Sequence, residues 1–268
     1  VAPFPQDLRA EHGFDNRGDH LSLSPLLMES FLNLSRSIVL SDNFNRKTCG
    51  VWPSLFEEPK EKDRTNEIID ERLNHFLTRA FRRPVDLVTL NRYSSHTTDL
   101  IKSGSSFLDA MKETVSAILA SPRFLYLYDS ESKHSKDYEL ATRLSFFLWG
   151  SIPDDMLIER AAVGDLSNTD VLRAQVDRML RDGKLKRFCD SFPSQWLQLD
   201  RIISSVPDPK KYPDFYYAPP NYRTTMDMMM EPLLLFETIL VEDRPITDLI
   251  DSDYSYRSKR LSKWYDSK

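Results

Sequence analysis

Glycine is scarce in this sequence, with seven residues in 268 against about 7% in average usage. Phosphate-binding loops, barrels and sandwiches depend on glycine wherever the backbone turns tightly. The scarcity therefore argues against these folds and favours helices. Gly104, Gly150, Gly164 and Gly183 each follow a segment of helical periodicity. Each of these glycines predicts a left-handed cap at the C-terminus of a helix.

Cysteine is scarcer still, since Cys49 and Cys189 are the only two. No CxxC pair is present, which excludes a zinc ribbon and a thioredoxin-like motif. No CxxCH is present either, which excludes a covalently attached c-type haem in this chain. We favour two buried thiols. A disulfide between these distant positions is the alternative.

Long apolar runs and an excess of basic charge are also missing. No run approaches the roughly 18 residues of a membrane span. The first residues, Val1-Ala-Pro-Phe-Pro, show no part of a signal peptide, so we expect either a cytosolic chain or a processed piece of a longer one. The 36 basic and 41 acidic residues give a net charge of −5. Because phosphate binding needs a basic surface, nucleic acid is not an expected partner.

What the sequence does contain is a recurring helical period, and no segment alternates as a strand would. N-terminal signals at Ser24-Pro25, at Asp86 and at the Ser106–Asp109 capping box predict where helices begin. Helices are predicted over about 24–40, 63–83, 86–102, 138–149, 171–180, 185–199 and 222–242, with further starts at 106 and 153. The predicted fold class is all-α, with two packed helical domains and irregular polar and proline-rich connections.

Residues 129–136 contain no apolar side chain and are the best candidate for a domain boundary. We predict an N-terminal loop, helix and connector over 1–62, a first helical domain over 63–128 and a second over 135–268. In the second domain, the spacing of Leu140, Leu144 and Phe147 predicts that these residues form the buried face of one helix. Pro232 predicts a kink in the long helix near the C-terminus.

One candidate binding site is a weak metal site near the N-terminus, formed by the oxygen atoms of Asp15, Asn16 and Asp19. Arg17 occupies a position where an EF-hand loop needs an oxygen ligand, and no Glu closes the loop, so an EF-hand is excluded. The favoured alternative is a hydrogen-bonded Asx turn that leads the chain into the helix at Ser24.

A second candidate is a weak anion site formed by Arg79, Arg82 and Arg83 at the end of a predicted helix. Spacings of three and four place Arg79 beside both others. Such a site would suit a propionate or an acidic sugar. The favoured alternative is a cationic helix C-terminus that pairs with nearby carboxylates. No nucleophile elbow, HExxH motif or catalytic triad can be assembled, so no catalytic residue is predicted.

Six phrases that occur in order resemble one known family. They are Asp7–Asp19, Arg79–Pro84, Ser121–Tyr126, Glu139–Trp149, Gln195–Leu199 and Glu242–Arg244. Together they resemble the cytochrome-c-associated multidomain proteins abundant in planctomycetes, verrucomicrobia and myxobacteria, which are built of successive domains of unknown function. The resemblance implies a helical core, a periplasmic or cell-envelope location and, often, an upstream cytochrome domain. Pro232 departs from the pattern of this family.

On this resemblance, we expect a helical module of an exported, c-type-cytochrome-linked protein that supports electron transfer or redox chemistry through a protein partner. That partner would be a c-type cytochrome or an envelope complex. No cofactor is expected in this chain, and haem c would be carried by the partner or by an upstream domain. Because the cytochrome domain is missing and the chain stops at Lys268, we expect a fragment, a processed piece or a truncated paralogue.

Two alternatives remain open. One is a non-catalytic scaffold or interaction subunit of a cell-envelope complex. The other is a polysaccharide-acting enzyme module, which would need a pair of carboxylates in a cleft.

Overall fold

The computed structural model describes residue 14 and residues 24–127, 136–205, 207–212 and 221–266. Every regular element in these residues is a helix, which confirms the all-α prediction. The chain divides into two compact units. The first contains Leu21–Phe146 and Ser151–Leu172, and the second contains Phe147–Gly150 and Arg173–Lys268. The domain boundaries predicted from the sequence stay a prediction.

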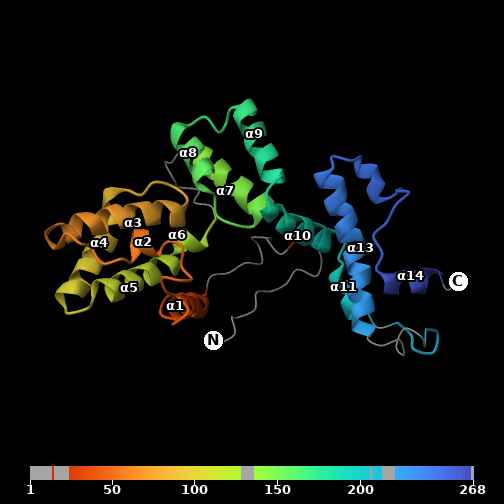
Figure 1. Ribbon diagram of the computed structural model, residues 1–268, viewed down its shortest axis with the longest axis horizontal. Coiled ribbons are helices and arrows are strands. Elements are labelled where there is room, and N and C mark those ends of the chain that lie inside the picture. The colour runs from red at the N-terminus through yellow and green to blue at the C-terminus, as the bar shows by residue number, and fades with distance from the viewer. Residues whose placement is uncertain (1–13, 15–23, 128–135, 206, 213–220, 267–268) are drawn as a thin grey trace. The chain divides into compact units, whose positions relative to one another are not determined.

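The first unit is built from helices in the N-terminal part of the chain (Figure 1). They are α1 (Pro25–Val39), α2 (Trp52–Leu55), the 3-10 helix η2 (Lys62–Arg64), α3 (Thr65–Phe81), α4 (Leu87–Lys102), α5 (Phe107–Leu119), α6 (Pro122–Leu125) and α8 (Asp155–Val163). Helix α7 (Lys136–Trp149) begins in this unit and ends in the second, and α9 (Thr169–Leu180) does the same.

Side-chain caps set the starts of several of these helices. Ser24, Asp86 and Ser106 each accept a hydrogen bond from the backbone N–H three residues further on, at 3.2, 2.6 and 3.1 Å. Ser106 also donates to the carboxylate of Asp109 at 2.7 Å. These bonds satisfy backbone donors that the first turn of a helix leaves unpaired. The helix starts predicted at these three residues are confirmed.

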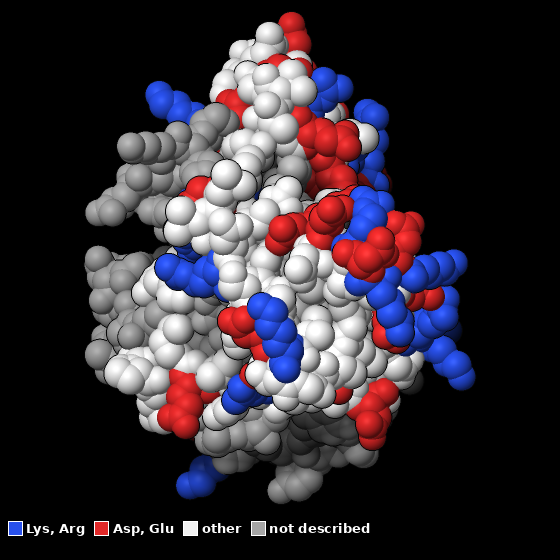
Figure 2. All heavy atoms as spheres, turned by 90° about the vertical axis from the view of Figure 1, so that its left-hand side faces the viewer, with Lys and Arg blue, Asp and Glu red and all other residues white. Residues whose placement is uncertain are grey.

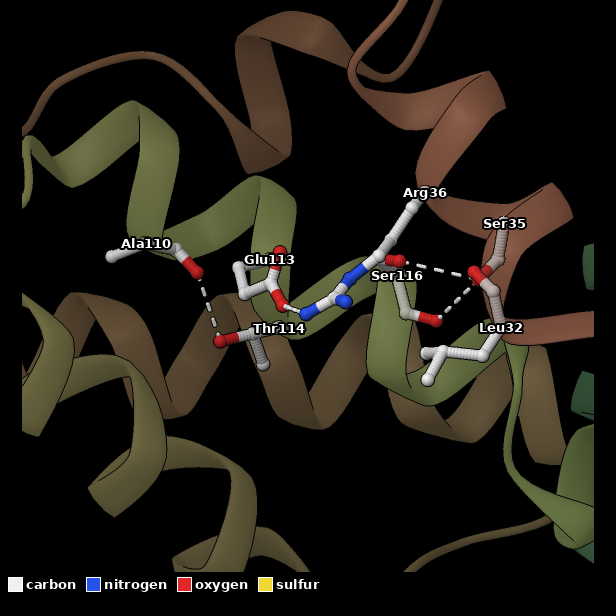
Figure 3. A network of polar contacts seen from close by, with 7 residues as sticks. All are labelled: Leu32, Ser35, Arg36, Ala110, Glu113, Thr114 and Ser116. Atoms are coloured by element: carbon white, nitrogen blue, oxygen red, sulfur yellow. Dashed lines mark hydrogen bonds and ion pairs between the residues drawn. The ribbon is translucent and has the colours of Figure 1, made fainter. Parts of the chain in front are cut away.

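Helix α5 packs against both α1 and α4, and paired hydroxyl groups join it to each of them. The Ser35 hydroxyl of α1 bonds to the Ser116 carbonyl of α5 at 3.0 Å, beside an ion pair between Arg36 and Glu113 (Figure 3). On the side of α4, the Thr97 hydroxyl lies 2.7 Å from that of Thr114, with both residues fully buried. Small hydroxyl residues allow close helix approach while each oxygen keeps a partner.

The core of the first unit is apolar and centres on α3 and α5. Its buried residues are Val39, Leu55, Phe56, Ile69, Leu73, Leu77, Ala80, Phe81, Phe107, Met111, Val115 and Ile118. The spacing within α3 follows the helical period, so one face of that helix is removed from water while the other remains available for polar residues.

The second unit contains the C-terminal helices (Figure 1). They are η3 (Gly183–Leu185), α10 (Lys186–Trp196), α11 (Asp200–Ser204), α13 (Asn221–Val241), η4 (Ile246–Leu249) and α14 (Lys259–Asp266). Helix α13 contacts α10, α11, η4 and α14. It continues through Pro232 as one helix, and the predicted kink stays a prediction. No helix of the described residues has both the length and the apolar character of a membrane span.

Two details of the helix ends differ from the sequence prediction. Gly104, Gly150 and Gly164 have positive φ angles, as predicted, but Gly183 does not. It begins η3 instead, because Asp182 accepts the Lys184 N–H at 2.8 Å and starts a new turn. The helix predicted over 185–199 ends earlier, at Trp196.

The buried face predicted for α7 is wrong by one position. Leu144 is only half-buried and Phe147 is 60% exposed, whereas Leu148 is 5% exposed and Ala141 and Ser145 are buried. The prediction followed the large apolar residues. The helix instead buries small residues, Ala141 and Ser145, together with the large side chains of Leu148 and Trp149.

Because of this shift, we expect truncation of two leucines of α7 to lower the free energy of unfolding by different amounts. Leu148→Ala should lower the free energy of unfolding by about 2–5 kcal/mol, because it leaves a cavity. Leu144→Ala, at the half-buried position, should lower the free energy of unfolding by less than half of that amount. Urea unfolding followed by far-UV circular dichroism compares the two variants, and a larger loss for Leu144→Ala would contradict the packing of α7.

Candidate functional site

The three arginines of the predicted anion site have different surroundings. Arg79 is 37% exposed, and its Nη1 lies 3.0 Å from a carboxylate oxygen of Asp155. Arg82 is 2% exposed and directed into the protein. Arg83 is half-buried just beyond the end of α3. The anion site stays a prediction, and Arg79 is the member that lines a cavity.

Arg82 joins the ends of α3 and α6. Its Nη1 donates to the carbonyls of Ala80 and Phe124 at 3.1 and 3.0 Å, and its Nη2 donates to those of Arg123 and Tyr126. Three of these carbonyls belong to the end of α6, where helical acceptors lack partners within the helix. Burial lowers the pKa of the guanidinium to about 10, and the charge of neighbouring Arg83 adds to this effect. Arg82 therefore has a structural role.

A cavity of about 640 Å³ lies along α3 in the first unit. Its charged and titratable lining, Glu71, Arg72, His75 and Arg79, comes from that helix. Glu71, His75 and Arg79 are spaced four residues apart, so they form one row on the helix surface. The apolar lining comes mainly from Val51, Leu55, Phe76, Ala80, Leu119, Phe124 and Ile152. Pockets for small molecules have this volume and this largely apolar character.

The charges beside this cavity are not equivalent. Arg72 donates from Nη1 to the carbonyls of Leu55 and Glu57, at 3.3 and 2.5 Å, so it links α3 to the end of α2. Burial lowers the pKa of Arg72, and the charges of Glu57 and Glu71 oppose that shift. The ion pair of Arg79 is more exposed, with its Asp155 side chain 65% exposed. Arg79 is therefore the cation less firmly held by the fold.

A row of aromatic rings lies in the second unit. Phe188, Phe192 and Trp196 stand four residues apart on α10, with ring centroids 5.2 and 5.7 Å apart along the row. Phe147 extends the row, 4.9 Å from Phe188. Phe236 of α13 lies 6.0 and 5.8 Å from Phe188 and Phe192 and is buried. We call Phe147, Phe188, Phe192 and Trp196 the aromatic row. Its two ends are 60% and 47% exposed.

A second cavity, of about 490 Å³, lies between α9, α10 and α13 in the second unit. Lys186 pairs with Glu237 at 3.2 Å and also with Asp190. Cys189 lines the cavity although its side chain is buried. Burial raises the pKa of this thiol to about 11, and the negative charge of Glu237 adds to the shift. The thiol is protonated at neutral pH and is therefore a poor nucleophile.

The predicted metal ligands Asp15, Asn16 and Asp19 lie outside the described residues, so the metal site stays a prediction. Their neighbour Phe14 is described, and its ring stacks on that of Phe192 with centroids 5.6 Å apart. Among the described residues, no group of three His, Cys, Asp or Glu side chains could hold a metal ion.

Both cysteines are free thiols, with Cys49 half-buried and Cys189 buried. The prediction of two buried thiols is therefore confirmed for Cys189 and is wrong for Cys49. The disulfide alternative stays a prediction, because the two cysteines lie in different units. On the face of the molecule in Figure 2, acidic and basic side chains lie interspersed rather than in separate patches.

Some features of these candidate sites could be seen in the sequence as spacing patterns, and others could not. The four-residue spacing of Phe188, Phe192 and Trp196 was visible, as was the row of Glu71, His75 and Arg79. Nothing marked the left-handed backbone at Arg82, where φ is 59°, because glycine is the usual residue at such a position.

Comparison with protein-family models gave three matches in sequence order. The model of the PSD3 family, described as a protein of unknown function (DUF1587), matches residues 1–41. The model of the PSD5 family, described as a protein of unknown function (DUF1595), matches residues 69–129. PSD4, a protein of unknown function (DUF1592), matches residues 136–266. Neither the curated proteins nor the solved structures gave a match.

The cavity along α3 lies mostly within the PSD5 match, and the aromatic row and the second cavity lie within the PSD4 match. These three domains are typical of cytochrome-c-associated multidomain proteins. The chain thus contains three domains of unknown function, in the order PSD3, PSD5 and PSD4.

Proposed function

We propose that this chain is a helical module of an exported, c-type-cytochrome-linked protein of the planctomycete and verrucomicrobial type, and that it supports electron transfer by binding a c-type cytochrome. The observation that carries this proposal is the occurrence of all three domains in one chain. In the proposal the module works in the periplasm or cell envelope. The haem is held by a partner or by an upstream domain.

The aromatic row is the surface that fits this role best. Phe147 and Trp196 are 60% and 47% exposed, so large apolar rings face water at both ends of the row. Aromatic residues are enriched in the cores of protein interfaces. The exposed rim of a haem is itself apolar, so contact with these rings would remove apolar surface from water on both sides.

The expected contact is small. Electron-transfer complexes often bury less than about 1,200 Å² in total, which permits rapid exchange of partners. Energy in such interfaces is concentrated in a few residues, with Trp prominent among them. Trp196 and Phe147 are therefore the residues whose replacement should weaken the complex most.

Sedimentation followed at the Soret band of a c-type cytochrome from the same periplasm tests the proposal directly. The cytochrome should sediment faster when this chain is added, and the combined variant Phe147→Ala, Trp196→Ala should bind at least tenfold more weakly. Leu87→Ala is the matched control, because Leu87 is also an exposed apolar residue, 75% accessible, but lies on α4 of the first unit.

Two results would contradict the proposal. One is unchanged sedimentation of the cytochrome at concentrations of both proteins in the high micromolar range. The other is an equal loss of binding in the control and in the combined variant, which would show that the aromatic row makes no special contribution. If the isolated chain showed a Soret band of its own, the assignment of the haem to a partner would be wrong.

A further inference from the structure

We propose that the cavity along α3 binds a small amphipathic carboxylate, a molecule with an apolar body and a single carboxylate group. The cavity belongs wholly to the first unit, whereas the aromatic row belongs to the second. The inference therefore does not rest on the proposed binding of a cytochrome.

The apolar part of the cavity supplies the surface for the body of the ligand. Phe76 and Ala80 of α3, Leu119 of α5 and Phe124 of α6 line it together. Phe76, Leu119 and Phe124 are only partly buried, although they pack against the core. A ligand would cover apolar surface that water now contacts, which is the main source of affinity for small molecules in such sites.

The polar part of the cavity selects the sign of the ligand charge. Glu71 is the single acidic residue in its lining, whereas Arg72, His75 and Arg79 are basic. Arg72 is held by two backbone carbonyls. Arg79 is the available cation, because its guanidinium can bind a carboxylate through two parallel hydrogen bonds.

Asp155 is the present partner of Arg79, and it is a weak competitor. The hydrogen bond and the short ion-pair contact of Arg79 with Asp155 both involve Nη1, at 3.3 and 3.0 Å. The pair is exposed on both sides, at 37% and 65% of the side-chain surface. Exposed ion pairs contribute little because water screens them. A ligand carboxylate beside apolar surface can therefore replace Asp155 or share the guanidinium with it.

Isothermal titration of the full chain with decanoate, decanol and decylammonium, all below their micellar concentrations, tests the charge selection. These probes share an apolar chain and differ in the head group. Decanoate should bind, decanol should bind at least tenfold more weakly, and decylammonium should not bind measurably. Equal affinity for decanoate and decylammonium would overturn the proposal, as would the absence of decanoate binding.

Two variants should shift decanoate affinity in opposite directions. Arg79→Gln should weaken binding at least tenfold, because the cation is lost. Asp155→Asn should strengthen binding, because it removes the competing carboxylate while Arg79 remains. Lys102→Gln is the matched control, since Lys102 is an exposed cation paired with Asp99 on α4, away from the cavity lining. Equal effects of Arg79→Gln and Lys102→Gln would refute a role for Arg79.

A third variant tests the location without changing charge. Ser54 is exposed and lines the cavity, so Ser54→Trp should obstruct it and abolish decanoate binding. Circular dichroism of each variant confirms that the helical fold is intact. Undiminished binding by a folded Ser54→Trp protein would place the ligand elsewhere.

Discussion

Replacing Trp149 with Ala is expected to lower the free energy of unfolding by about 3–5 kcal/mol, the range for removing a large buried aromatic ring. The side chain is fully buried in the second unit, and its Nε1 donates to the Met179 carbonyl at 3.1 Å. Lys184 Nζ lies 4.4 Å from the ring centroid and the Arg178 guanidinium carbon 5.3 Å from it. Alanine would leave a cavity, an unpaired carbonyl and two cations without their aromatic partner.

Two further variants separate these contributions in urea unfolding followed by far-UV circular dichroism. Trp149→Phe refills most of the volume but cannot donate to Met179, so it should cost clearly less than Trp149→Ala. Trp196→Ala removes the same ring from a site that is 47% exposed and should cost less than half as much. Similar losses for Trp149→Ala and Trp196→Ala would show that burial of Trp149 does not stabilise the second unit.

Replacing Arg82 with Ala is expected to lower the stability of the first unit by about 2–4 kcal/mol. A buried acceptor left without a partner costs about 1–3 kcal/mol. The total for four carbonyls is smaller than their sum, because three of these bonds are only partly buried and water can replace part of what is lost. The lost donors serve Ala80, Phe124, Arg123 and Tyr126. Hydrogen exchange should show the largest loss of protection in α6 and at the end of α3, because Arg82 joins these two segments.

Comparison of three substitutions separates the side chain of Arg82 from its backbone. Arg82→Gly should be less harmful than Arg82→Ala, because φ is 59° at this residue and glycine adopts that conformation without the roughly 1–2 kcal/mol cost that other residues pay. Arg82→Lys should restore little of the lost stability. An ammonium group lacks the planar, forked arrangement of donors with which the guanidinium reaches four carbonyls. Full stability in Arg82→Lys would mean that charge alone accounts for the role of this residue.

The helical elements could be predicted because their signals are local. Ser24, Asp86 and Ser106 cap helices through hydrogen bonds to residues three positions away, so the whole interaction is contained in a few consecutive residues. Where such a signal competes with another, prediction fails. Gly183 suggested a helix end, but the neighbouring cap at Asp182 starts a new turn there.

The face that a helix buries was less predictable, because it depends on the size of the residues that meet it. The apolar pattern of α7 pointed to Leu144 and Phe147, whereas the buried residues include Ala141, Ser145, Leu148 and Trp149. The residue types along one helix contain no information about how closely another helix approaches.

The candidate sites show the same division between local and long-range causes. The row of Glu71, His75 and Arg79 and the spacing of the aromatic rings on α10 follow from helical periodicity, so they are properties of short stretches of sequence. The cavity beside α3 exists because α2, α5 and α6 close around that helix, and Arg82 is buried because α6 places three carbonyls within its reach. These contacts join residues some forty positions apart, and their geometry depends on packing that no local pattern encodes.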